Sequence, residues 1–263
     1  MSDKYNYLLL DNKVCVITGV SSPGGIGYAT AELFAAHGAK LVLLDLQMND
    51  STEQKIRQSI AGAIGYEPDL LAIPCDITRY DACDNAMSMA FARFGNIHCL
   101  VNCAGIVRPG SILSIEEAEF DAVIDVNLKG TYNICKSVLK VFKQNQEGAI
   151  VNLSSLAAQR GGGLVGGTHY AASKGGVISL TRSIAREFAQ YGIRANVICP
   201  AMIETDMLDI LTETQLKEIV SSIPLKRAGK PIDLAGTCLF LVSELSGFIT
   251  GATIDVNGGM HIH

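Results

Sequence analysis

A tyrosine and a lysine four residues apart could form a proton-transfer pair. Tyr170 and Lys174 stand at the head of a helical pattern, so their side chains lie on one helix face. A free tyrosine has a pKa of about 10 and is almost fully protonated at neutral pH. A neighbouring ammonium group stabilises the phenolate and lowers that pKa. The pair therefore predicts proton exchange with the oxygen of an alcohol or a carbonyl group. Upstream, two serines follow an apolar run, and one hydroxyl there could hydrogen-bond the same substrate oxygen.

A glycine-rich loop, TGVSSPGGIG at 18–27, lies between a predicted strand and a predicted helix. It does not match the dinucleotide fingerprint G-x-G-x-x-G. Its position nevertheless offers free backbone N–H groups and a positive helix end to a pyrophosphate. Eighteen residues after Gly27, Asp45 ends the second predicted strand. A carboxylate there accepts hydrogen bonds from a ribose 2′-OH and repels a 2′-phosphate, so the sequence predicts NAD as the cofactor.

The elements that must position these residues alternate along the chain. Apolar runs without polar alternation predict strands covered on both faces, and strand–helix alternation predicts a doubly wound parallel sheet with helices on both faces. We expect one α/β domain over 1–263, with ligands in the crevice at the carboxyl ends of the strands. The predicted strands are 14–19, 40–45, 70–76, 97–102, 149–154, 194–200 and 252–256. The predicted helices are 26–37, 52–64, 79–94, 116–143, 170–190 and 231–243, and Gly38, Gly95 and Gly192 cap three of them.

Composition narrows the classes of partner. The net charge is −5 and no basic run occurs, so we expect no nucleic-acid partner. The first residues contain neither a signal peptide nor a membrane span, and we expect a cytoplasmic protein that does not bind membranes. The eight cysteines form no C-x-x-C pair and mostly lie in apolar runs, which predicts free thiols and no metal site.

Together these features resemble the short-chain dehydrogenase/reductase family, in its shorter single-domain branch, over essentially the whole chain. The resemblance implies a Rossmann fold, hydride transfer between a nicotinamide and a secondary alcohol or ketone, and a homotetramer. It depends on Thr18-Gly19…Gly25-Ile26-Gly27, Asp76-Ile77, the NCAG motif at 102–105, Asn127 in DVNLKG, Ser155, Tyr170-x-x-x-Lys174 and the segment 200–205.

The resemblance also implies residue roles. Tyr170 is the general acid/base, Ser155 orients the substrate oxygen, Lys174 lowers the pKa of the tyrosine, and Asn127 holds a water that links Lys174 to solvent. The implied cofactor-binding residues are Gly19, Ser21, Ser22, Gly25, Ile26, Gly27, Asp45, Asp76, Ile77, Asn102, Ala104, Gly105, Tyr170, Lys174, Pro200, Ile203 and Thr205.

Three departures from the family pattern stand out. The glycine loop is two residues longer than T-G-x-x-x-G-x-G. The stretch from Ser155 to Tyr170 is also two residues longer, which leaves Ser154 as an alternative catalytic serine, although alignment on the strand favours Ser155. The usual Pro-Gly after the sixth strand is Pro200-Ala201.

The substrate is less sharply predicted. An NAD enzyme more often oxidises an alcohol, so we favour a sugar, a polyol or a small hydroxy acid over a 3-oxoacyl thioester. A cofactor-binding sensor without catalysis is the rival from another class. Arg160, Arg108 and His169 lie in segments that could face the substrate, the arginines toward an anionic group and His169 as a capping or rim residue. The segment 202–230 is predicted to cover the substrate as a lid.

Overall fold

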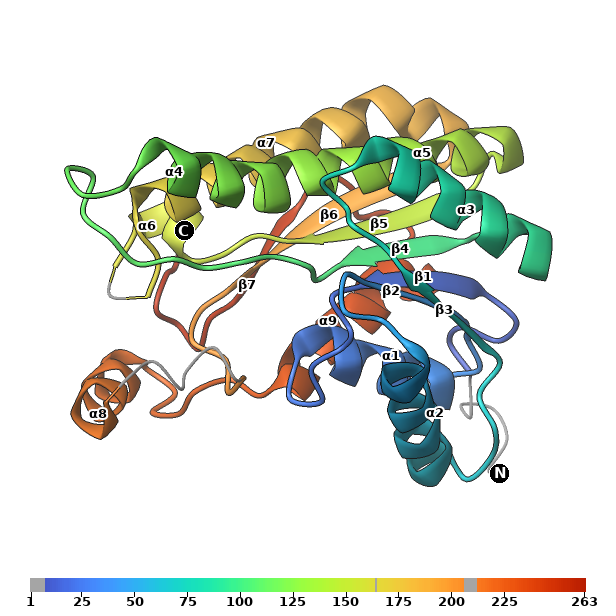
Figure 1. Ribbon diagram of the computed structural model, residues 1–263, viewed down its shortest axis with the longest axis horizontal. Coiled ribbons are helices and arrows are strands. Elements are labelled where there is room, and N and C mark those ends of the chain that lie inside the picture. Colours follow the sequence, from blue (N-terminus) through green and yellow to red (C-terminus); the bar gives the residue numbers. More distant parts are fainter. Residues whose placement is uncertain (1–7, 164, 206–211) are drawn as a thin grey trace.

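The computed structural model describes residues 8–163, 165–205 and 212–263. A parallel sheet of seven strands forms its centre, in the order β3-β2-β1-β4-β5-β6-β7, with helices on both faces (Figure 1). The predicted doubly wound sheet is confirmed, and each predicted strand is present with ends shifted by at most two residues. The strands are β1 (Val14–Thr18), β2 (Lys40–Asp45), β3 (Leu70–Pro74), β4 (Cys99–Asn102), β5 (Gly148–Leu153), β6 (Ile193–Pro200) and β7 (Thr253–Val256).

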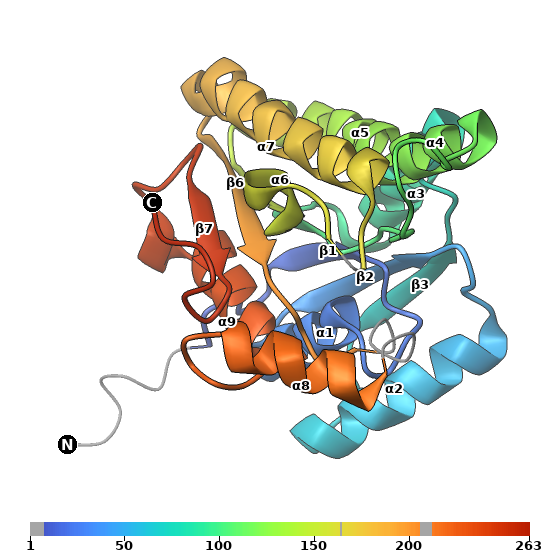
Figure 2. The same cartoon turned by 90° about the vertical axis from the view of Figure 1, so that its left-hand side faces the viewer.

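The helices form two layers, which the turned view separates clearly (Figure 2). One face of the sheet is covered by α1 (Ile26–Ala36), α2 (Asp50–Ile64) and α9 (Pro231–Val242). The other is covered by α3 (Tyr80–Phe94), α4 (Glu117–Ile124), α5 (Thr131–Asn145) and α7 (Thr168–Phe188).

Alternate side chains of a strand enter the two cores. In β1, Ile17 packs in the core that contains Phe34 of α1, whereas Val16 packs in the core that contains Phe142 of α5. Both faces of the strand are therefore buried, which is why the sequence shows continuous apolar runs. The predicted glycine caps are present with left-handed backbone, at φ +85° for Gly38, +76° for Gly95 and +68° for Gly192.

The helix predicted over 116–143 differs from the structure at its centre. A π-helical turn, Asp125–Gly130, separates α4 from α5. The turn adds an extra residue per hydrogen-bonded ring, and such turns occur often at functional sites. It contains Asn127, whose placement is described below.

Two short helices lie at the carboxyl end of the sheet. α6 (Ala157–Arg160) follows β5, and α8 (Glu213–Ser222) follows β6 and lies apart from the sheet (Figure 1). α8 belongs to the predicted lid at 202–230, of which residues 206–211 lie outside the described residues. An isolated bridge between Ile203 and Gly229 closes the base of this segment.

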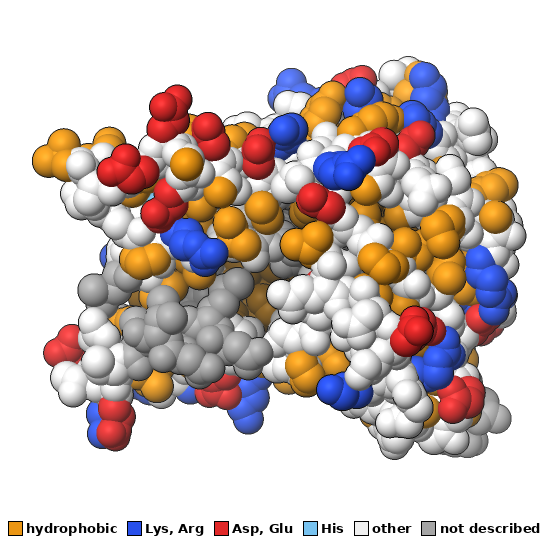
Figure 3. All heavy atoms as spheres, in the orientation of Figure 1, with side chains coloured by type: hydrophobic (Ala, Val, Ile, Leu, Met, Phe, Trp, Pro, Cys, Tyr) orange, Lys and Arg blue, Asp and Glu red, His pale blue; other side chains and the backbone are white. Residues whose placement is uncertain are grey.

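The surface carries both signs of charge. Acidic side chains gather over α4, while the Lys and Arg side chains visible on the same face are dispersed (Figure 3). In the described part of the chain no helix has the length and apolar character that a membrane span requires. All eight cysteines are free thiols, and seven of them are buried, as expected.

A buried polar ladder joins the central strands near their carboxyl ends. Thr18 donates to Asn102 (3.4 Å), Asn102 donates to Asn152 (2.7 Å), and Asn152 donates to Thr181 of α7 (2.9 Å). Each amide thus finds a partner in the core, which is the condition for burying such groups without a large cost. The ladder ties α7 to the point between β1 and β4 where the strand order reverses.

Candidate active site

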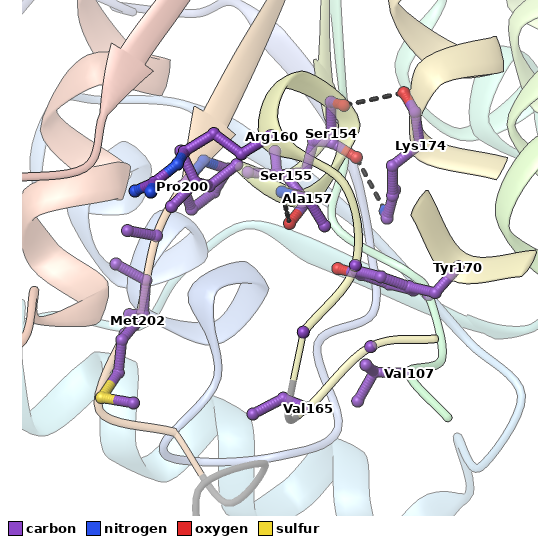
Figure 4. A pocket seen from close by; sticks show the side chains of 18 of the residues that line it. Val107, Ser154, Ser155, Ala157, Arg160, Val165, Tyr170, Lys174, Pro200 and Met202 are labelled. Carbon is purple, nitrogen blue, oxygen red and sulfur yellow. Dashed lines mark hydrogen bonds between the residues drawn. The ribbon is translucent and has the colours of Figure 1, made fainter. Parts of the chain in front are cut away.

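A cavity of about 440 Å³ opens at the carboxyl ends of β4, β5 and β6. Ser155, Tyr170 and Lys174 all line it, although they come from the end of β5 and from α7. Figure 4 shows the three side chains converging on one part of the cavity. The structure therefore brings together the residues that the sequence pairs for proton transfer.

The two candidate serines face different partners. Ser154 is 4% exposed and donates its hydroxyl to the backbone oxygen of Lys174 at 2.8 Å. Ser155 accepts a hydrogen bond from the backbone N–H of Ala157 at 3.1 Å and interacts with Tyr170. The Ser155 hydroxyl is not committed to a backbone oxygen, so in a substrate complex its proton can turn from Tyr170 to a substrate oxygen.

Lys174 is buried, and its amine is hydrogen-bonded to the protein backbone. Its Nζ donates to the backbone oxygen of Leu153 at 2.8 Å, and the side chain is only 5% exposed. Burial disfavours the ammonium form and lowers the pKa of Lys174 to about 8. The amine therefore exchanges a proton more readily near neutral pH than an exposed lysine does.

The pKa of Tyr170 depends on burial and on Ser155. Burial raises the pKa of Tyr170 above its ordinary value, and a hydrogen bond with Ser155 opposes that rise. The Lys174 Nζ lies 6.0 Å from the ring centroid of Tyr170. Burial is the largest cause of this shift, and the lowering of the Tyr170 pKa by Lys174 stays a prediction.

Asn127 fastens the loop after β4. Its Oδ1 accepts from the N–H of Ile106 at 2.8 Å, and its Nδ2 donates to the oxygen of Ile106 at 2.9 Å and to the Ser173 hydroxyl at 3.1 Å. Both amide donors are thus used within the protein. The side chain fixes the wall of the cavity, and its predicted hold on a water stays a prediction.

Position 105 requires glycine because Asn127 and Lys174 both lie close to its backbone. A Cβ added to Gly105 would lie 3.1 Å from Asn127 Oδ1 and 3.3 Å from Lys174 Nζ. A side chain there would push directly against two of the proposed relay residues. Gly105 also lines the cavity, so the backbone after β4 lies beside the reacting groups.

The glycine loop forms a cradle at the start of α1. Gly19 has φ +71°, and a Cβ on Gly27 would overlap the backbone oxygen of Gly19. Gly25 is the N-cap of α1, no side chain caps this end, and the first turn carries no acidic residue. The first N–H groups of the helix are therefore available to an anion, which fits the pyrophosphate of a dinucleotide.

Asp45 is joined to the same loop. Its carboxylate accepts from the N–H of Ser21 at 3.0 Å and from the N–H of Gln47 at 2.9 Å. These bonds hold the carboxylate at the end of β2, beside the inserted residues of the loop. Ser22 accepts from the N–H of Gly25 at 2.9 Å, which closes the turn before α1.

The other predicted cofactor residues fall into two groups. Asp76 accepts two hydrogen bonds from Thr78, and Ile77 is buried with its backbone oxygen bound by Asn133, so these two stabilise the turn after β3. The Ala104 N–H donates to Thr18. Four further predicted residues line the cavity itself: Ile26, Pro200, Ile203 and Thr205.

Two of the predicted substrate contacts, His169 and Arg108, do not line the cavity. His169 is 1% exposed and does not line the cavity; its Nε2 lies 3.5 Å from Glu119 of α4. The prediction of a rim residue is wrong, because α7 begins at Thr168 and turns this side chain into the helix layer. Arg108 is exposed, does not line the cavity, and donates to the oxygen of Val107.

Arg160 does line the cavity, but its guanidinium group has a protein partner. It donates to the backbone oxygen of Met260 at 2.9 Å. Figure 4 shows the group directed away from Tyr170. Through this hydrogen bond, Arg160 stabilises the part of the cavity wall that contains Met260.

Several cavity residues carry no chemical signal in the sequence. They are apolar, come from distant segments and include Ile106, Val107, Leu156, Val165, Met202, Ile219 and Met260. The helical pattern at 213–222 was the available signal for Ile219. Nothing local in the sequence brings Met260 to the cavity.

Comparison with known proteins agrees with this geometry. A family model described as enoyl-(acyl carrier protein) reductase matches residues 19–261. An uncharacterised short-chain type dehydrogenase/reductase of Sinorhizobium fredii is 40% identical over 97% of this chain and 100% of its own. The chain belongs to the short-chain dehydrogenase/reductase family. The matched range includes Gly19–Gly27 of the glycine loop, Ser155, Tyr170 and Lys174.

Two further relatives place the chain within this family of oxidoreductases. The 3-oxoacyl-(acyl-carrier-protein) reductase FabG of Thermotoga maritima is 39% identical over 96% of this chain and 99% of its own. The crystal structure of gox2181 superposes with a TM-score of 0.89 at 28% identity, covering 96% of this chain and 97% of that one. Members of the short-chain dehydrogenase/reductase family bind a nicotinamide cofactor, and the cradle and Asp45 described above fit one.

Proposed function

We propose that the protein is an NAD-linked oxidoreductase that interconverts 3-oxoacyl and 3-hydroxyacyl thioesters. The observation that carries the substrate class is the cavity wall. Away from Ser155, Tyr170 and Lys174, the described lining is mostly aliphatic side chains, methionine and glycine. A sugar or polyol would leave several hydroxyls against this wall without partners, and unpaired buried hydroxyls weaken binding strongly. The wall thus favours an acyl chain over the sugar or polyol that the sequence suggested.

The comparison supports the same direction. The Thermotoga maritima relative carries the name of a 3-oxoacyl-(acyl-carrier-protein) reductase. Two features support NAD as the cofactor. Asp45 faces the loop insertion, where its carboxylate would repel a 2′-phosphate. The residues that follow it, Leu46–Met48, include no Lys or Arg that could bind a 2′-phosphate.

The chain's own residues would perform the acid–base step. The nicotinamide supplies or accepts the hydride when it is bound. In the reductive direction, Tyr170 donates its phenolic proton to the carbonyl oxygen, while Ser155 donates a hydrogen bond to the same oxygen. In the oxidative direction, the Tyr170 phenolate takes the proton from the alcohol. Lys174, with a pKa near 8, can return a proton to Tyr170.

A substrate panel tests the proposal. Rates are measured with 3-oxoacyl thioesters of increasing chain length, and with sugars, polyols and short hydroxy acids. Burying one methylene contributes about 0.8 kcal/mol, so kcat/KM should rise about fourfold per methylene until the chain fills the cavity. Higher kcat/KM with polyols, or no dependence on chain length, would contradict the substrate class.

A substitution of the acid–base residue tests the reaction itself. Tyr170→Phe should abolish turnover and leave NADH binding within a few-fold of wild type, since the ring and its packing remain. Turnover at the wild-type rate in Tyr170→Phe would refute the proton-transfer role. A wild-type protein that binds NADH but turns over no member of the panel would favour the sensor.

A further inference from the structure

We propose that Asp255, His261 and His263 form a binding site for a divalent transition-metal ion, with Zn²⁺ as the matching ion. Each residue offers one ligand atom, and these atoms all lie within 4.8 Å of one another. His263 Nε2 is 3.1 Å from Asp255 Oδ2, and the two imidazole ring centroids are 4.7 Å apart. Ligands on a tetrahedral Zn²⁺ stand about 3.3 Å from one another, so small side-chain rotations suffice.

A tight turn brings the two histidines back to Asp255. Asp255 lies on β7, and the turn that follows contains Gly258 and Gly259 with φ +63° and +90°. The Asn257 side chain closes this turn, donating to the oxygen of His261 at 3.1 Å and accepting from the N–H of Gly259 at 2.9 Å. Because other residue types are strained at such φ values, the sequence itself encodes the return of the chain.

The carboxylate is oriented by a neighbour outside the cluster. Gln159 of α6 donates to Asp255 Oδ1 at 2.8 Å, which leaves Oδ2 facing His263. The same amide lies 3.3 Å from His263 Nε2, the nitrogen that would turn to the ion. A hydrogen bond to the second carboxylate oxygen is the usual support of a metal-binding carboxylate. Asp255 is also partly buried, with its side chain 19% exposed.

The donor set indicates which ions fit. Two imidazoles and one carboxylate suit Zn²⁺, Ni²⁺, Co²⁺ or Cu²⁺, whereas Mg²⁺ and Ca²⁺ prefer oxygen ligands alone. Three protein ligands leave the fourth tetrahedral position to water. Asp255, His261 and His263 are not among the residues that line the cavity with Ser155, Tyr170 and Lys174, so we assign the ion no part in the reaction.

The position of the site suggests what the ion does. Met260 immediately precedes His261, lines the cavity, and is bound through its backbone oxygen by Arg160. An ion held by residues on both sides of the turn would fix the segment that carries Met260. We therefore expect the bound ion to stabilise the C-terminal segment and the adjoining cavity wall.

The test uses the metal-free protein, prepared with a chelator that is then removed. Zn²⁺ is titrated by calorimetry, and Co²⁺ by its visible absorption. We expect one ion per chain, and a Tm increase of about 5–10 °C at a 100-fold excess over Kd. Hydrogen exchange in the peptide 257–263 should slow when Zn²⁺ binds.

Variants decide whether these residues are the ligands. Asp255→Asn and the double variant His261→Ala/His263→Ala should each weaken Zn²⁺ binding at least tenfold, whereas His37→Ala should bind like wild type. Each variant's Tm without metal shows that it is folded. Equal binding by the double variant, or no binding to the wild type at millimolar Zn²⁺, would overturn the site. None of these measurements involves turnover, so they stand apart from the proposed reaction.

Discussion

Replacing Ser155 with alanine removes the one hydrogen bond that holds down the pKa of Tyr170. Hydrogen bonds to charged groups are worth about 1 kcal/mol more than those between neutral groups, and that difference corresponds to nearly one pKa unit. Alcohol oxidation needs the phenolate, so its rate rises with pH through this pKa. We therefore expect the rising limb of the oxidation profile to move up by about one pH unit in Ser155→Ala.

The same substitution removes a donor to the substrate oxygen. Loss of one such donor typically lowers kcat by about 10²–10³, so the plateau should fall by that factor as well. The assay is kcat/KM for NADH formation across pH, measured for wild type and variant with one 3-hydroxyacyl thioester, because kcat/KM reports the free enzyme in which Ser155 bonds to Tyr170. Two effects are thus expected from one hydroxyl, a lower plateau and a displaced limb.

The neighbouring serine supplies a matched control. Ser154 donates to the oxygen of Lys174, whereas the hydrogen bond that lowers the pKa of Tyr170 comes from Ser155. Ser154→Ala should lower the free energy of unfolding by about 1 kcal/mol and leave the limb in place. An unmoved limb in Ser155→Ala, or an equal displacement in Ser154→Ala, would refute the assignment of Ser155 as the partner of Tyr170.

Three further substitutions test the surrounding structure. Asp45→Ala removes the carboxylate that binds Ser21, so the ratio of kcat/KM for NAD to that for NADP should fall at least about tenfold; an unchanged ratio would contradict its ribose role. Gly27→Ala places a methyl group against the Gly19 oxygen, so NADH affinity and Tm should both drop, and the free energy of unfolding should fall by about 1–3 kcal/mol. Wild-type affinity together with wild-type Tm would argue against the cradle. Lys174→Met removes a buried amine whose pKa is lowered to about 8 in the folded protein. The folded wild type releases this proton before the unfolded chain does, so its stability relative to Lys174→Met should rise between about pH 8 and pH 10.5 in urea unfolding, and a flat or falling difference would be inconsistent with that burial.

The elements that the sequence predicted well are those with local signals. The strands were predictable because burial on both faces demands uninterrupted apolar runs, and Gly38 and Gly95 marked helix ends because left-handed backbone favours glycine. Tyr170 and Lys174 were predictable as a pair because one turn of α7 alone places them together. In each case the physical cause acts within about ten residues of chain.

The π-helical turn around Asn127 had no such signal. Its Asn127 amide is bound at both ends by the Ile106 backbone in the loop after β4, from 21 residues away. The burial of Tyr170 had no local signal either. Spacing on a helix gives proximity to Lys174, but burial depends on the whole cavity, and burial raises the pKa of the tyrosine here.

The substrate class depends on the least local feature of all. The wall beyond the reacting groups combines Val107 after β4, Val165 before α7, Ile219 of α8 and Met260 of the C-terminal turn. None of these side chains has a distinctive type or spacing, so each looks like ordinary core in the sequence. Only their convergence shows that the cavity is apolar, and it is this convergence that shifts the expected substrate from a polyol toward an acyl chain. The residues proposed to perform the chemistry are therefore visible in the sequence, whereas those proposed to select the substrate become visible only in the fold.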